Sequence, residues 1–297
     1  MTVRTPVVPA PLLVLTSIAS IQFGGAFART LFEDLGAAGV TVLRLTIAAL
    51  VVAVATRPRV RTWSPAAWTA ATLLGVTVGT MNLLFYLALR TVPLGILVTV
   101  ASLGPLLLAL VQTRRLPDLT WAALAAVGVV LLGWDPGATA PAGGLLLGFA
   151  AGLCGAGYIL LSARLGRLVP GTGGLAVSLA VASLLVLPFG AGGASAAFDD
   201  PALLLGGAVV AVLCSVLPSG LELHALRRMP TRVFGILMSL QPAGGAIAGL
   251  LVLDQRLRPL EILALVLVML ASAGVTVSRR APVTDPPSPG ASPPRRT

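Results

Sequence analysis

Ten apolar runs, each close to the length of a membrane-spanning helix, occupy most of this 297-residue sequence. A spanning helix needs about 20 mainly apolar residues, because each residue advances the helix by about 1.5 Å. In lipid a helix also satisfies every backbone N–H and C=O group within its own segment. The sequence therefore predicts an all-α polytopic membrane protein. The expected spans are 11–28, 35–56, 66–88, 91–112, 119–134, 143–163, 173–193, 201–226, 230–253 and 259–278.

One stretch of the sequence occurs twice, at 88–105 and at 225–242, with an offset of 137 residues. The two copies align without a gap and share seven of eighteen positions, including an arginine in the turn and a proline late in the apolar run. This duplication predicts two five-helix repeats. An odd number of helices in each repeat inverts the second copy in the membrane. The expected units are a first repeat at 1–136, an inverted second repeat at 143–278, and a disordered, proline-rich polar tail at 279–297.

The arginines are distributed unevenly between the two sets of connections. If the N-terminus is inside, 15 of the 20 arginines lie in inner connections and only Arg29, Arg90, Arg256 and Arg258 lie in outer ones. Short cytoplasmic loops carry an excess of basic residues. Both termini are therefore predicted to be cytoplasmic. The net charge of +10 follows from this topology and indicates no nucleic-acid partner, because the arginines are dispersed among short loops.

Residue types that are rare or absent exclude several kinds of chemistry. The sequence has no lysine, so it has no P-loop and no Schiff-base site. One histidine, His224, and two cysteines, Cys154 and Cys214, cannot supply a three- or four-ligand metal site. No G-x-S-x-G motif occurs, and no two acids lie together within the spans. We therefore expect no cofactor, no metal and no catalytic residues, and an intramembrane enzyme is the least favoured alternative.

Four segments resemble the EamA-type branch of the drug/metabolite transporter superfamily: 19–25, 36–45, 81–96 and 221–242. Within that branch the sequence is most similar to bacterial threonine/homoserine exporters. The resemblance covers about residues 11–278. It implies ten helices in two inverted repeats, a central cavity, and export across the bacterial inner membrane driven by an ion gradient. It also implies an acid four residues before the second proline of the first copy, and another directly before the second proline of the second copy. This sequence has Ala101 and Gln241 at those two places.

The paired prolines, Pro105 and Pro242, are the first candidates for the central site. Proline cannot donate a backbone hydrogen bond and its ring clashes with the preceding turn, so each helix should bend or open there. Interruptions at matching places in two halves indicate a transporter's central site. For either proline alone, an ordinary kink in a membrane helix is the alternative. Ser102 and Ser239, three residues before their prolines, could bind substrate or only satisfy carbonyls that the kink frees.

Charged and polar residues within the spans are the other candidates. A charge at the bilayer centre costs about 2.5–3.5 kcal/mol on insertion scales, so Arg44 and Glu222 should face the protein interior or water. A structural pair for Arg44, and a membrane-edge pair with a loop arginine for Glu222, are the alternatives. Glu261 and His224 are expected at the membrane interface. The remaining candidates for substrate binding are Gln22, Asn82, Tyr86, Tyr158 and Gln241, each of which could instead hydrogen-bond a neighbouring helix.

These patterns together predict a secondary exporter of small polar metabolites. Amino acids such as threonine and homoserine are the first choice of substrate, and protons the first choice of driving ion. Export of a drug or another metabolite by the same fold is the alternative. The expected partners are the small-molecule substrate and the lipid bilayer, and a homodimer is left open.

Overall fold

The structure is a computed structural model that describes residues 9–58, 60–112, 116–134, 140–169, 173–226, 228–229 and 231–278. These residues form helices and no strand. The first half of the chain contains α1 (Ala10–Thr30), α2 (Phe32–Thr56), the short 3-10 turn η1 (Val60–Thr62), α3 (Pro65–Leu89), α4 (Leu94–Gln112) and α5 (Leu116–Trp134). The second half contains α6 (Ala142–Leu168), α7 (Gly173–Asp199), α8 (Pro201–Ala211), the π-helical turn η2 (Val212–Val216), α9 (Leu217–Leu226), α10 (Thr231–Met238), α11 (Gln241–Leu253) and α12 (Pro259–Ser278).

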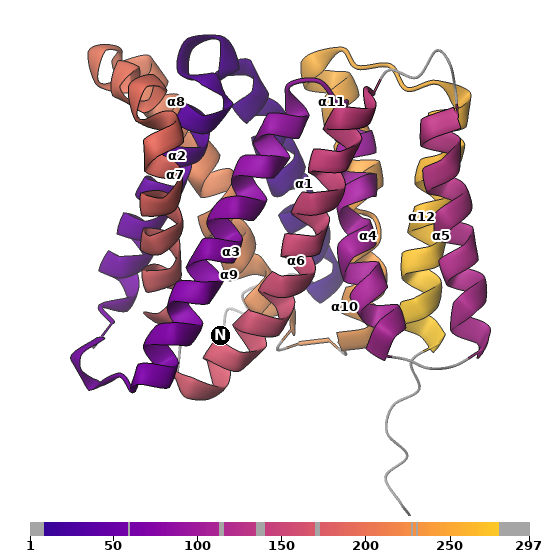
Figure 1. The fold of residues 1–297 in the computed structure, drawn as a ribbon, viewed down its shortest axis with the longest axis horizontal. Helices are drawn as coiled ribbons and strands as arrows, with labels where there is room; N and C mark the ends of the chain where they lie inside the picture. Colours follow the sequence, from indigo (N-terminus) through magenta and orange to yellow (C-terminus); the bar gives the residue numbers. More distant parts are fainter. Residues whose placement is uncertain are drawn as a thin grey trace, which may run out of the picture.

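The helices stand side by side and alternate in direction, so that their connections gather at the two ends of one bundle (Figure 1). Within the described ranges, nine helical segments are long and apolar enough to cross a membrane. They are α1 to α4, α6, α7, Pro201–Glu222, Val233–Leu253 and Pro259–Val277. The predicted all-α polytopic membrane protein is therefore confirmed. The expected tail at 279–297 lies outside the described residues.

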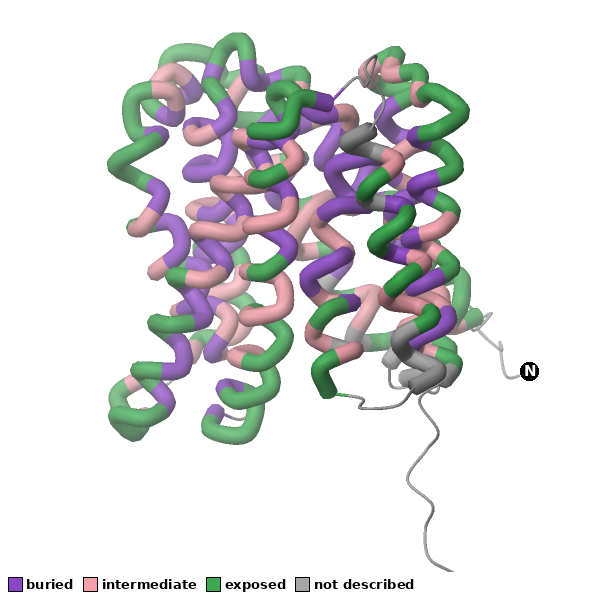
Figure 2. The backbone as a smooth tube through the Cα atoms, turned by 45° about the vertical axis from the view of Figure 1, so that its right-hand side comes forward, coloured by how far each residue is buried: buried purple, intermediate pink, exposed green. Residues whose placement is uncertain are grey.

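The outer surface of the bundle is apolar, as lipid requires. Exposed positions lie along the outward faces of the helices, and buried ones where helices meet (Figure 2). Leu50, Val54, Leu146 and Phe198 are 61%, 70%, 69% and 76% exposed. In water, such side chains over a whole bundle would mark an aggregation-prone surface. Hydrocarbon solvates them at no cost.

The expected span at 201–226 is helical, with one wider, π-helical turn at η2. The N–H of Leu217 donates to the carbonyl of Val212, five residues back, in place of the usual four. Pro218 follows immediately, and it can neither donate to the preceding turn nor tolerate that turn's carbonyl against its ring. This gives a physical reason for the wider turn. Such π-turns are frequent at functional sites.

The expected span at 230–253 is divided in two. α10 ends at Met238 and α11 begins at Gln241, which leaves a two-residue turn at Ser239 and Leu240, just before the residue that precedes Pro242. Pro242 then lies in the first turn of α11, where its missing N–H removes no helical hydrogen bond. α4, by contrast, continues as a helix past Pro105. The predicted opening is therefore found at Pro242, whereas the helix at Pro105 is uninterrupted.

Glycines allow α6 to lie very close to α4. Side chains of Thr91 and Val92 occupy the space beside Gly144, and Leu97 occupies the space beside Gly148. A Cβ on Gly152 would overlap the carbonyl of Ala101. Small residues four apart are typical of closely packed membrane helices. This contact brings the segment of α4 around Pro105 against α6 and forms one wall of the site described next.

Candidate functional site

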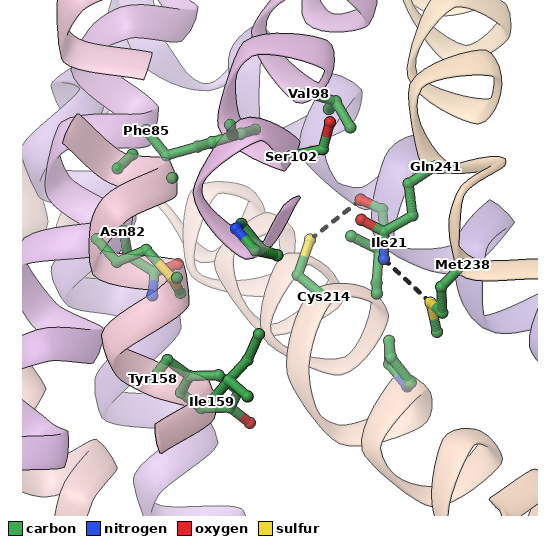
Figure 3. A pocket seen from close by; sticks show the side chains of 18 of the residues that line it. Ile21, Asn82, Phe85, Val98, Ser102, Tyr158, Ile159, Cys214, Met238 and Gln241 are labelled. Atoms are coloured by element: carbon green, nitrogen blue, oxygen red, sulfur yellow. Dashed lines mark hydrogen bonds between the residues drawn. The ribbon is translucent and has the colours of Figure 1, made fainter. Parts of the chain in front are cut away.

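A cavity of about 1130 Å³ lies within the bundle. Its walls come from both halves of the chain, including α1, α2, α3, α4, α6, η2, α9, α10, α11 and α12. Part of this wall is drawn in Figure 3. All the residues that the sequence suggested line this cavity: Gln22, Arg44, Asn82, Tyr86, Ser102, Pro105, Tyr158, Glu222, Ser239, Gln241 and Pro242. Arg44 and Glu222 both face this cavity, and the functional roles of these residues stay predictions.

Arg44, on α2, has polar contacts but no carboxylate partner among the residues that the structure describes. Its Nη1 donates to the Tyr86 hydroxyl at 3.2 Å, and its Nε donates to the Ser215 hydroxyl at 3.4 Å. Its guanidinium carbon lies 5.6 Å from the centre of the Tyr86 ring. No carboxylate of the described part of the chain lies within 4.0 Å of it. A guanidinium has five N–H donors, so Arg44 keeps donors for a ligand in the cavity.

Tyr86 is held in place by its neighbours, and this holds Arg44 as well. The side chain is only 1% exposed, and its ring packs against Phe32 at 5.6 Å and Phe85 at 6.2 Å between ring centres. Aromatic pairs at this spacing are favourable beyond their burial alone. The hydroxyl therefore stays in position to accept from Arg44.

The wider turn η2 supplies two cavity residues that sequence reasoning missed, Cys214 and Ser215. The Cys214 thiol contacts the carbonyl of Ile21 on α1, with a sulfur–oxygen distance of 3.7 Å (Figure 3). Ser215 accepts from Arg44. Pro218 within an apolar run was the available signal, because a proline there predicts an altered turn just before it.

Glu222, on α9, accepts a hydrogen bond of 2.7 Å from Ser17 of α1. Ser17 is fully buried, and it is a third residue that sequence reasoning missed. No arginine in the described ranges lies at ion-pair distance from Glu222. The alternative for Glu222, an ion pair with a loop arginine at the membrane edge, is therefore not formed within the described ranges. Among the described residues Glu222 is the one carboxylate that lines the cavity.

Gln22 and Gln241 connect α1 to the break between α10 and α11. Gln22 Nε2 donates to the backbone carbonyl of Gln241 at 3.0 Å, and Gln241 Nε2 contacts the Met238 sulfur at 3.2 Å (Figure 3). Gln22 is 3% exposed. A side-chain amide thus satisfies a carbonyl near the break, and this stabilises the interrupted span.

Asn82 and Tyr158 lie on the far side of the view in Figure 3 from Gln241 and Met238. Asn82 Nδ2 donates to the carbonyl of Val78 in its own helix at 2.8 Å. Within the described residues it therefore forms no bond to a neighbouring helix, which was the alternative. No hydrogen bond within the described part of the chain occupies its Oδ1, although Asn82 is only 7% exposed. Tyr158, on α6, is 37% exposed.

Ser102 and Ser239 make matching hydrogen bonds in the two halves. Each hydroxyl donates to the carbonyl three residues earlier, Ser102 to Thr99 at 2.7 Å and Ser239 to Ile236 at 2.6 Å. The carbonyls that Pro105 and Pro242 leave without an N–H partner are four residues before each proline, at Ala101 and Met238. Ser102 therefore does not satisfy the carbonyl that Pro105 frees, whereas Ser239 bonds a carbonyl in the last turn of α10, next to the break. The Ala101 carbonyl faces Gly152 of α6 instead.

The two residues expected at the membrane interface, Glu261 and His224, do not line the cavity. Glu261 is 2% exposed and accepts from the backbone N–H of Arg258 at 2.8 Å, which caps the start of α12. It lies in the first turn of α12, at one end of the bundle, so its expected place at the membrane interface stays a prediction. His224 is exposed and bonds Gly220 in α9. No group of three metal-ligating side chains is found in the described ranges.

The broken span predicts unequal effects for the two prolines. Pro242→Ala restores an N–H that can donate to the Met238 carbonyl and rejoin α10 with α11, so we expect transport to fall roughly tenfold at normal expression. Pro105→Ala changes a helix that is already continuous, and we expect a loss of about two- to threefold. Pro65→Ala, at the exposed start of α3, is the matched control. Efflux assays in cells measure all three, and normal efflux by Pro242→Ala would reduce the break to a packing feature.

A bundle of apolar helices around a cavity with polar groups defines a membrane transporter, and the comparisons agree. The model of the EamA-like transporter family matches residues 142–277. The chain is 38% identical over 280 residues to the threonine/homoserine exporter RhtA of Escherichia coli (strain K12), covering 93% of this chain and 94% of that protein. It is 39% identical, with the same coverage, to RhtA of Salmonella typhimurium (strain SL1344). The chain therefore belongs to the EamA-like transporter family.

The resemblance seen in the sequence is thereby confirmed, and with it the prediction of a small-metabolite exporter that is not an enzyme. A solved crystal structure also matches, with a TM-score of 0.60 at 17% identity, over 90% of this chain and 96% of its own. At that identity it shows a shared fold alone. The protein is a multi-pass protein of the inner membrane with a small-molecule substrate.

Proposed function

We propose that this protein exports threonine, homoserine or closely similar amino acids, as the names of its relatives suggest. The observation that carries the proposal is Arg44, a cation in the cavity wall without a carboxylate partner among the described residues. An amino acid brings such a carboxylate. The planar guanidinium matches a carboxylate with two parallel hydrogen bonds, which lysine cannot do. Tyr86 and Ser215 hold the guanidinium at the cavity wall.

The rest of the cavity offers partners for the other polar groups of such a substrate. Glu222 is an acceptor for an ammonium group, and Asn82 Oδ1, which has no hydrogen-bond partner among the described residues, is an acceptor for an ammonium or hydroxyl group. A buried acceptor without a partner is costly, so a substrate that satisfies it gains affinity and selectivity. This set of groups supports a zwitterion with a short polar side chain.

The cavity volume supports a second candidate, a larger metabolite or a drug. A volume of about 1130 Å³ lies above the roughly 300–1,000 Å³ typical of pockets for drug-sized ligands. One amino acid would leave much of that space to water. Export of both classes through the same cavity is compatible with this volume.

We further propose that Glu222 carries the coupling proton. Acids within membrane spans commonly form proton relays. Ala101 and Gln241, where the family resemblance implies acids, cannot ionise, so Glu222 takes that role here. Ser17 holds the carboxylate at the cavity wall. In this scheme the substrate and the proton compete for the region around Glu222. Each transport cycle exchanges a substrate molecule for a proton.

We propose two inverted five-helix repeats at 1–136 and 143–278, with α5 as the tenth span. Helices one repeat apart pack against each other, namely α2 with α7, α4 with α11 and α5 with α12. The contact of α3 with α6 likewise corresponds to that of α1 with η2 and α9. Thr46 and Ser183, which are 137 residues apart, share a hydrogen bond of 2.6 Å. A residue that contacts its own repeat equivalent lies on a pseudo-twofold axis, and 137 is the offset of the duplicated stretch.

The arginine pattern supports cytoplasmic termini and an external connection at 134–143. The connection between α2 and α3, which carries Arg57 and Arg61, lies at the lower end in Figure 1, where α6 also ends beyond Arg164 and Arg167. We expect Arg61→Cys to be labelled only from the cytoplasmic face by a membrane-impermeant thiol reagent, and Arg90→Cys only from the outside. The parent for both is a variant without Cys154 and Cys214. Reversed labelling would overturn the orientation.

The function is tested by metabolite accumulation in cells that lack their own threonine exporters. Cells fed a threonine-containing dipeptide should retain less intracellular threonine, and release more, when they express the protein. An Arg44→Ala variant expressed at the same level is the control. Normal threonine retention, together with resistance to toxic compounds, would favour the second candidate. Normal retention and no resistance would contradict both.

A further inference from the structure

The connection between α3 and α4 is held on one side by Arg29. Nε of Arg29 donates to the carbonyl of Leu89 at 3.1 Å, and Nη2 donates to the carbonyl of Arg90 at 3.2 Å. Its guanidinium carbon lies 5.4 Å from the centre of the Phe32 ring. One side chain of α1 therefore binds two carbonyls at the end of α3, where helical carbonyls lack partners. This fastens the corner between α1 and α2 to the end of α3.

Gln255 holds the same connection from the other side. Its Oε1 accepts from the backbone N–H of Leu94, the first residue of α4, at 2.9 Å. Its own N–H donates to the carbonyl of Gly249 at 3.0 Å, and Asp254 before it has a φ of 50°. The N–H of Asp254 bonds the same carbonyl, so the left-handed residue and the one after it are both fixed against the last turns of α11. A rigid end of α11 thus presents the side chain that caps α4.

Leu94 lies between these two contacts and fills the meeting point of three helices. It is fully buried, yet it lines the cavity. Glycines face it from both partners, Gly25 on α1 and Gly245 and Gly249 on α11. A larger residue at Gly249 would overlap the Gln255 side chain. The α1–α2, α3–α4 and α11–α12 connections all lie at the upper end in Figure 1.

We propose that Leu94 is the gate that closes the cavity at this end, and that Arg29 and Gln255 are the latches that keep it closed. The proposal rests on the proposed function, because it takes the cavity as the transport route. All three contacts converge on the short segment from Leu89 to Leu94. Moving that segment away from α1 and α11 breaks the latch bonds together and opens the cavity at this end. The freed donors and carbonyls lie at the bundle end, where water replaces the lost hydrogen bonds.

Thiol labelling tests the gate without any substrate, so its result is independent of what the protein exports. Cys214 lines the cavity and is the reporter, in a Cys154→Ser parent, with a membrane-impermeant cationic methanethiosulfonate. We expect Arg29→Ala and Gln255→Ala each to raise the labelling rate of Cys214 about fivefold. The rise should come only from the membrane face at which Arg90→Cys is labelled. Leu94→Ala should raise the rate from the same face without removing either latch.

Two matched variants separate latching from general damage. Gln255→Glu keeps an acceptor oxygen for the Leu94 N–H and should label like the parent. Arg90→Ala removes an exposed cation from the same connection but keeps the carbonyl that Arg29 binds, so it should also label like the parent. An unchanged rate in all three test variants would overturn the proposal. So would an equal rise in Arg90→Ala, or a rise from both membrane faces.

Discussion

Glu222→Gln should abolish export against a substrate gradient while leaving exchange of substrate across the membrane. Glutamine keeps the size of the side chain and an acceptor for Ser17, but it cannot bind and release a proton. We expect uphill transport driven by a pH gradient to fall about tenfold or more, which corresponds to the loss of a typical coupling free energy between two ligands. The measurement is uptake of labelled threonine into inside-out vesicles with an imposed pH gradient.

The control for this prediction is Glu33→Gln, the same chemical change at an exposed acid in the first turn of α2, outside the cavity. It should transport at the parent rate. Substrate exchange without a pH gradient shows that Glu222→Gln still folds and binds. Full pH-driven uptake by Glu222→Gln would rule out this carboxylate as the coupling group and would indicate another ion.

Arg44→Ala should weaken substrate binding most strongly. A hydrogen bond between charged partners contributes about 1.5–3 kcal/mol, so we expect KM for threonine to rise about 10- to 100-fold. Because the lost contact is to the substrate carboxylate, the KM for analogues without a carboxylate should be the same in Arg44→Ala as in the parent. Transport in the same vesicles, over a range of threonine concentrations, measures the change.

Two milder variants distinguish carboxylate binding from packing around Arg44. Arg44→Lys keeps the charge but not the planar pair of donors, so it should recover only part of the affinity. Tyr86→Phe removes one hydrogen bond of 3.2 Å but keeps the ring against Phe32, and it should change KM by about threefold. An unchanged KM in Arg44→Ala at normal expression would contradict a role for this residue in binding.

The spans and the candidates for the cavity could be predicted from the sequence because both depend on local chemistry. Length and apolar content decide whether a segment crosses a bilayer, and the helices begin and end within a few residues of the expected runs, except that α6 and α7 extend five or six residues further. The high cost of a charge in lipid places Arg44 and Glu222 inside the bundle, whatever the packing of the helices. The same cost explains why these two charged candidates line one cavity.

The partners of these residues were decided by the tertiary structure. Ser17 binds Glu222 from 205 residues away, Ser215 contacts Arg44 across 171, and Gln255 caps α4 across 161. Such pairs depend on which helix faces lie together, and a stretch of apolar sequence does not specify this. The two prolines make the same point. Both lack an N–H, but only the span at Pro242 is interrupted. The surroundings differ: α4 around Pro105 packs against Gly152 of α6, whereas Gln22 of α1 bonds the backbone carbonyl of Gln241 beside the break. Contacts between helices decide such a difference, and the sequence of a single span does not specify them.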